Sequence, residues 1–226
     1  MRFAYAYALP MSDPFELVAK GDLDGLRNAL SHDPGLVEAR HPSGASLVAW
    51  AAYMGNVGAI SAIRALLEQL DPHEAIILRD GARLEAALAG GWDANQRSPD
   101  GFTPLSLAAF FENAEAFDLL LPLTTDVNAA ARNPQKVAAL HAACAKRNTG
   151  MVEKLLMAGA DPNQVQADGF TPLHAAAQHG DGAIAGLLLL AGARPEQRNA
   201  AGDDAATLAR KAGHDWLANK LLALGK

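Results

Sequence analysis

The sequence predicts an all-α solenoid of stacked helix–turn–helix units, and the main observation is an internal repeat. The phrase Asp-Gly-Phe-Thr-Pro-Leu occurs twice, starting at Asp100 and again at Asp168. A related phrase lies between them, with Leu140 placed almost midway between Leu105 and Leu173. Ala and Leu dominate a composition that is 50% hydrophobic and only 6% aromatic, which favours closely packed helices over sheets. A period of roughly 34 residues in such a chain indicates a repeat architecture.

A second phrase keeps the same period. The segments WDAN, TDVN and ADPN place Asp93, Asp126 and Asp161 at nearly equal spacings along the chain. Gly202 follows Gly169 after nearly the same interval and opens a last copy. Because independent phrases share one spacing, we infer that a structural unit is repeated.

Each unit contains signals for two helices. Thr171 precedes Pro172, so the Thr side chain can cap a helix whose first position tolerates proline. Gly180 is placed to end this helix, and Gly192 to end a second one over residues 183–191. The Asn, Asp and Gly residues between successive pairs suit tight turns.

These residues resemble the ankyrin repeat motif, Asp-Gly-x-Thr-Pro-Leu-His-x-Ala-Ala. The segment from Asp168 to Ala176 matches it throughout, and the segment from Asp100 to Ala109 matches with Ser106 in place of His. Leu140 and His141 keep the centre of the motif without the preceding Thr-Pro. The resemblance covers residues 12–226 and implies a single ankyrin-repeat domain.

We expect seven repeats, the first and last serving as caps with one polar face. A flexible N-terminal extension is expected over residues 1–11. Because the third repeat follows the second helix of its predecessor almost directly, the turn near Leu70–Pro72 should be missing or shortened. The repeats are predicted at residues 12–40, 41–70, 71–98, 99–131, 132–166, 167–199 and 200–226.

Net charge, hydrophobic runs and cysteine content argue against several classes of partner and location. The net charge is −6 and the basic residues form no stripe, which argues against a nucleic-acid partner. The apolar runs are too short for a membrane helix, so no membrane partner is expected. Cys144 is the only cysteine, which favours a reducing compartment, and the short apolar run at the N-terminus is unlike a secretion signal. We expect a cytoplasmic monomer.

Catalytic interpretations find little support in the sequence. His141 and Cys144 lie three residues apart, as a base and a thiol could, but the resemblance implies that His141 ties helix and turn together and that Cys144 replaces a buried alanine. The run GDGAIAG from Gly180 lacks the spacing and the preceding strand of a dinucleotide loop. No metal site, no cofactor and no enzymatic activity are expected.

The resemblance implies binding through a concave surface. Its contact positions lie just after the paired alanines of each repeat and next to the motif glycine. Large apolar side chains at these positions indicate a protein partner, although the aromatics could instead pack between repeats. The predicted partner-binding residues are Tyr53, Met54, Leu78, Phe102, Phe110, Phe111, Lys146, Phe170, Gln178 and His179.

The sequence therefore predicts a non-enzymatic protein–protein interaction module. Two alternatives stay open: a regulatory or inhibitory subunit of an enzyme, such as an immunity-type protein, and a secreted effector. The identity of the partner is not encoded in the repeat scaffold.

Overall fold

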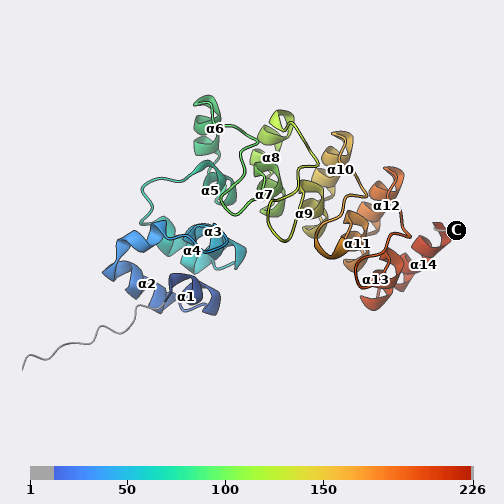
Figure 1. Cartoon of the computed structure of the whole chain (residues 1–226), viewed down its shortest axis with the longest axis horizontal. Helices are drawn as coiled ribbons and strands as arrows, with labels where there is room; N and C mark the ends of the chain where they lie inside the picture. Colours follow the sequence, from blue (N-terminus) through green and yellow to red (C-terminus); the bar gives the residue numbers. More distant parts are fainter. Residues whose placement is uncertain (1–12, 225–226) are drawn as a thin grey trace, which may run out of the picture. The chain divides into compact units, whose positions relative to one another are not determined.

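The computed structural model describes residues 13–224, and the regular secondary structure of this part consists of helices joined by turns and loops (Figure 1). Its only extended pairing is one antiparallel bridge between Arg40 and Ser46. The all-α prediction is confirmed. The predicted extension, residues 1–11, lies outside the described residues. The chain divides into two compact units, residues 1–74 and 75–226, which we describe separately.

Unit 1 contains two helix pairs and the start of a third. Its first helices pack on each other, as do its second helices, so that the pairs stack. Leu26, Leu47 and Ile63 lie fully buried between them. The elements are α1 (Pro14–Lys20), α2 (Leu23–His32), a 3-10 helix (Pro34–Glu38), α3 (Leu47–Tyr53), α4 (Val57–Arg64) and the beginning of α5 (Pro72–Ile77).

Unit 2 continues the same plan. Helices α7, α9, α11 and α13 pack against one another in order, and α10 packs against α12 beside them (Figure 1). Buried Leu107, Leu140 and Leu173 lie on successive first helices. The helices are α6 (Gly81–Ala89), α7 (Pro104–Phe110), α8 (Ala114–Leu120), α9 (Ala139–Ala145), α10 (Thr149–Met157), α11 (Pro172–Gln178), α12 (Gly182–Leu190), α13 (Ala205–Lys211) and α14 (Asp215–Leu224).

The connections between helix pairs differ in length. Residues 90–103 join α6 to α7 and residues 158–171 join α10 to α11, whereas only residues 65–71 join α4 to α5. The predicted shortening near Leu70–Pro72 is therefore confirmed. Each of the seven predicted repeat ranges contains one helix pair, but the exact limits of the repeats remain a prediction.

The repeated Asp-x-Asn phrase links neighbouring connections. The Asn128 side chain donates to the Gly159 carbonyl at 3.3 Å and accepts the Asp161 N–H at 2.7 Å. Asn163 repeats both bonds one unit later, to the Gly192 carbonyl at 2.9 Å and from the Arg194 N–H at 2.8 Å. These asparagines satisfy backbone groups outside any helix, which explains why the phrase recurs with the period of the fold.

Polar side chains also join the second helices to the preceding pair. Asn113 begins α8 by accepting the Ala116 N–H at 3.1 Å, and it donates to the carbonyl of Ile76 at 2.9 Å. Asn56 does the same at the start of α4, with a bond to Val18 in unit 1. One amide thus caps a helix and fixes the spacing between two repeats.

Candidate functional site

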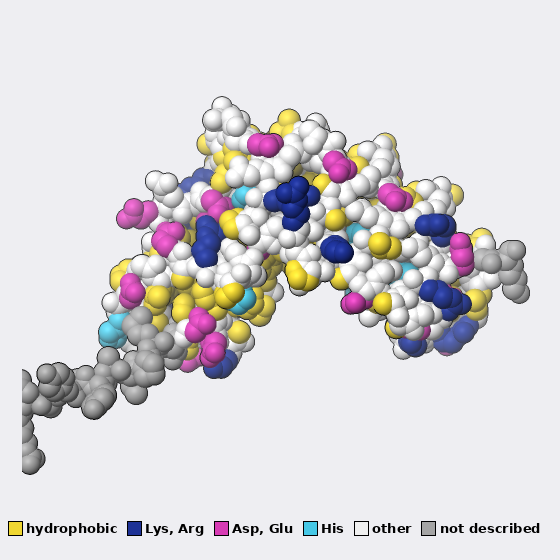
Figure 2. Space-filling model, viewed as in Figure 1, with side chains coloured by type: hydrophobic (Ala, Val, Ile, Leu, Met, Phe, Trp, Pro, Cys, Tyr) yellow, Lys and Arg dark blue, Asp and Glu magenta, His cyan; other side chains and the backbone are white. Residues whose placement is uncertain are grey.

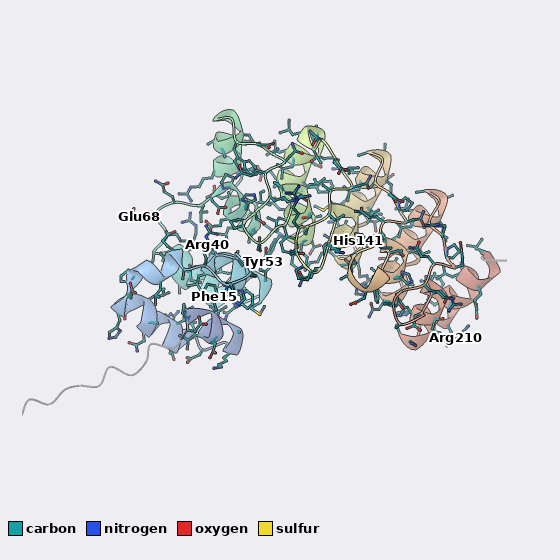
Figure 3. The ribbon with its side chains drawn as sticks, viewed as in Figure 1. Phe15, Arg40, Tyr53, Glu68, His141 and Arg210 are labelled. Atoms are coloured by element: carbon teal, nitrogen blue, oxygen red, sulfur yellow. The ribbon has the colours of Figure 1, made fainter. Side chains whose placement is uncertain are left out.

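Two buried histidines of unit 2 hold helix starts. The Nδ1 atom of His174 accepts the N–H of Thr171 at 3.0 Å, and its Nε2 lies 3.2 Å from the carbonyl of Asp203. His141, labelled in Figure 3, accepts the Ala138 N–H at 3.4 Å and reaches the Gln164 carbonyl at 3.0 Å. Since Nδ1 is an acceptor in both rings, Nε2 carries the proton and donates onward. The predicted structural role of both histidines is confirmed.

The electrostatics of His141 and Cys144 do not suit nucleophilic catalysis. Burial lowers the pKa of His141 to about 4, and burial, with a smaller contribution from Asp181, raises the pKa of Cys144 to about 12. At neutral pH the thiol therefore keeps its proton, and both nitrogens of the imidazole already have backbone partners. A thiolate nucleophile needs the opposite shift. Within residues 13–224, moreover, no three His, Cys, Asp or Glu side chains are grouped to hold a metal.

The predicted binding residues of unit 2 gather mainly where its first helices end. We call this set the helix-end row. Phe110 is the last residue of α7 and Phe111 its C-cap, and Lys146 caps α9. Because α7, α9 and α11 are neighbours, their ends form consecutive positions of one surface. The row consists of Leu78, Phe110, Phe111, Lys146, Gln178 and His179.

The centre of the helix-end row is an aromatic pair under a cation. The rings of Phe110 and Phe111 meet edge to face, with centroids 5.1 Å apart and planes at 81°. The Nζ atom of Lys146 lies 4.2 Å from the centroid of Phe110. All three side chains are half-buried, so each keeps surface for a further contact. The two contacts orient the rings before any partner arrives.

Gln178 and His179 are exposed at the end of α11, and Leu78 is half-buried after α5. The row is thus polar at one end and apolar at the other.

Two arginines that the sequence analysis did not single out support this row. Arg79 donates from Nη2 to the carbonyl of Phe111 at 2.8 Å, and Arg147 forms an ion pair with Asp181 at 3.5 Å. Both have positive φ, 58° and 57°, at the position where Gly180 has 65°. A side chain is disfavoured there by roughly 1–2 kcal/mol. The sequence does carry an indication of this role: each Arg stands at the position where another repeat has Gly, and from there its side chain reaches the next repeat.

Four of the predicted residues are not members of the row. Phe102 and Phe170 occupy the tight turns before α7 and α11 and are half-buried; the Phe170 ring lies 5.5 Å from that of His174, so it braces the turn. Tyr53 ends α3 in unit 1, where Figure 3 labels it, and Met54 caps the same helix. Tyr53 is half-buried, while Met54 is 47% exposed.

The family comparison agrees with this geometry. A model of ankyrin repeats, in three copies, matches residues 73–166 and 140–226. The stacked helix pairs and the histidine-capped starts of α9 and α11 are the structural counterpart of that match. The chain belongs to the ankyrin repeat family, whose members are generally protein–protein interaction modules and typically lack catalytic activity. No helix within residues 13–224 is long and apolar enough to cross a membrane.

Proposed function

We propose that this protein is a non-enzymatic interaction module that binds a protein partner through its concave ankyrin surface, with the helix-end row as the main contact in unit 2. The observation that supports this most directly is the half-buried pair of Phe110 and Phe111 next to Lys146. Partly exposed aromatics that cluster at family contact positions favour an interface over a solvated face.

The row is suited to binding because it is held in place before binding. The bond from Arg79 fixes the backbone at Phe111, and the ion pair between Arg147 and Asp181 fixes the turn after Lys146. A partner therefore loses little binding free energy to ordering of these groups. Lys146 adds a charge at the edge of the aromatic pair, which favours orientation and association rate more than affinity.

The test begins with isolation of the partner by affinity purification from the native cell and mass spectrometry. Binding of that partner is then measured by calorimetry for the wild type and for Phe111→Ala. An anchor worth about 2 kcal/mol predicts affinity weaker by about 30-fold. The matched control is Leu190→Ala, which removes an exposed apolar side chain from the outer helix α12 and should leave affinity unchanged.

Far-ultraviolet circular dichroism of Phe111→Ala should match the wild type. If the variant unfolds, the ring packs between repeats and its role is structural. If it stays folded and binds with full affinity, the partner uses another face and the proposal fails.

A further inference from the structure

A polar pocket lies apart from the helix-end row, between two neighbouring connections of unit 2. It has a volume of about 350 Å³, and its walls come from the connection before α7, the start of α7 and the connection after α8. Its most prominent side chains are Arg97 and Arg132, one from each connection. Figure 2 shows one patch of Lys and Arg side chains over the part of unit 2 where Figure 1 draws α7.

Within residues 13–224, the two guanidinium groups lack hydrogen-bonded partners. Among the described residues, neither Arg97 nor Arg132 has a side-chain hydrogen bond or an ion pair, although Arg147 and Arg198 of the same unit both pair with carboxylates. Burial, and then the positive charge of Arg132, lower the pKa of Arg97, whereas Asp126 opposes the shift. An arginine keeps its charge despite such a shift. Two like charges therefore share one pocket.

The neutral polar groups of the wall are already engaged. Asn95 donates to the Leu123 carbonyl at 3.1 Å and accepts the Thr125 N–H at 2.9 Å, and the Thr125 hydroxyl bonds the same amide oxygen. Thr124 donates to the Leu120 carbonyl at 2.9 Å. The Thr103 hydroxyl accepts the Ser106 N–H at 3.1 Å. The guanidinium N–H groups are the charged donors left to meet a ligand. Donors without acceptors call for an oxyanion.

An arginine at the equivalent position of the last repeat behaves differently. Arg198 lies four residues before Gly202, as Arg97 lies four before Gly101. Yet Arg198 donates to the Gly202 carbonyl and pairs with Asp204 at 3.5 Å. The repeat therefore has a way to neutralise this arginine within the chain, and the copy at Arg97 does not use it.

We propose that the pocket between Arg97 and Arg132 binds a carboxylate, supplied by an Asp or Glu side chain of the protein partner. With two arginines and Asp126 the pocket has a formal charge of +1, from two positive charges and one negative, which matches a singly charged carboxylate. Asp126 disfavours the second charge of a phosphate. The proposal rests on the proposed protein-binding function for the source of the ligand.

The test uses the full chain and a probe instead of the partner. Acetyl-Gly-Glu-Gly-amide is titrated into ¹⁵N-labelled protein while the Nε–Hε signals of the arginines are followed by NMR, with acetyl-Gly-Gln-Gly-amide and inorganic phosphate at equal ionic strength as comparisons. The signals of Arg97 and Arg132 should shift with the Glu peptide and not with the Gln peptide. Phosphate should bind less tightly than the Glu peptide.

Variants distinguish binding at this pocket from general attraction of the peptide to positive charge. Arg97→Gln and Arg132→Gln should each weaken the Glu peptide at least about 10-fold, since each removes a charge-assisted bond. Arg198→Gln, the matched control, should change its affinity less than about twofold. Equal shifts with the Gln peptide, tighter phosphate binding, or unmoved Arg97 and Arg132 signals in the wild type would each overturn the proposal. Because the wild-type titration needs no variant and no partner, this failure is distinct from failure of the helix-end row.

Discussion

Two helix starts of this chain, those of α5 and α11, use the same hydrogen bonds with different chemistry. At α5 the Asp71 N–H donates to the Glu74 carboxylate at 3.0 Å, and the Glu74 N–H donates to Asp71 Oδ1 at 2.9 Å. At α11 the Thr171 N–H donates to His174 Nδ1 at 3.0 Å, and the His174 N–H donates to the Thr171 hydroxyl at 3.4 Å. Both are reciprocal caps spanning three residues, with proline at the first helical position.

The two caps differ in the further contacts that His174 and Glu74 make beyond their own helix starts. The ring of His174 has a second nitrogen, which bonds the Asp203 carbonyl in the following connection. The Asp71–Glu74 pair makes its further contacts with earlier residues: the Glu74 carboxylate accepts a hydrogen bond from the Ser46 side chain, and Arg40 lies 3.6 Å from Asp71. His73, within the same helix, lies 3.5 Å from Asp71. The cap made of Thr and His is therefore bonded to the following connection, whereas the cap made of Asp and Glu contacts residues of the preceding repeats.

The largest effect should come from removal of the histidine that links repeats. In His174→Leu, the buried Thr171 N–H loses its acceptor, while the Asp203 carbonyl loses one donor and keeps the Asn199 N–H. An unpaired buried group costs about 1–3 kcal/mol and a lost hydrogen bond about 1 kcal/mol, so the free energy of unfolding should fall by roughly 3 kcal/mol. Urea denaturation followed by circular dichroism measures this change.

The control for this variant is His179→Leu, at the exposed end of the same helix, which should change stability by less than about 0.5 kcal/mol. Equal losses in the two variants would mean that the second bond of His174 contributes nothing.

The buried histidines of unit 2 should also make the free energy of unfolding depend on pH, with a smaller effect than the loss of His174. The folded pKa of His141 is about 4 against an ordinary 6.5, and burial also lowers the pKa of His174. The unfolded chain therefore takes up protons first as pH falls. The stability from His141 is complete above pH 6.5 and is lost progressively toward pH 4; between pH 7 and pH 5 the loss should be about 2 kcal/mol.

Urea midpoints measured at half-unit pH steps check this dependence. His141→Gln removes the titrating group, so its stability should vary less between pH 7 and pH 5 than that of the wild type. Parallel curves for the two proteins would contradict the assignment.

Much of the fold was predictable because the same short sequence motifs recur in successive repeats. The pairing of Thr171 with His174, the turn glycines and the repeat period predicted the helix pairs, their order and the shortened connection after α4. The placement of Phe110, Phe111 and Lys146 at successive helix ends followed from the same register.

What escaped prediction depends on contacts between residues of different repeats. Arg97 differs from Arg198 only when the two repeats are compared: Arg198 pairs with Asp204 six residues later, whereas Thr103 stands six residues after Arg97, which has no ion pair among the described residues. The bond from Arg79 to Phe111 joins residues 32 apart. The carboxylate cap at Asp71 is written in the sequence as Asp-Pro-His-Glu, but it departs from the family motif and is recognised only as a pair.

The smallest effect should come from neutralising that carboxylate cap. Burial, with help from the charge of Asp71, raises the pKa of Glu74. A raised folded pKa means that the stability from this group is full below its unfolded pKa and is lost as pH rises through the folded pKa. Glu74→Gln removes the charge and keeps a carbonyl to accept the Asp71 N–H. Its free energy of unfolding at pH 7 should therefore exceed that of the wild type, by less than about 1 kcal/mol.

The gain should disappear near pH 4, where Glu74 is neutral in the wild type as well. Glu85→Gln, on the exposed side of α6, serves as the control and should change stability little at either pH. A loss above about 1 kcal/mol in Glu74→Gln at pH 7 would show that the ionised carboxylate strengthens its hydrogen bond by more than its burial costs. In that case the two caps would both depend on strong acceptors, and they would differ in direction: His174 is bonded to the following connection, and Glu74 to Ser46 of the preceding repeat.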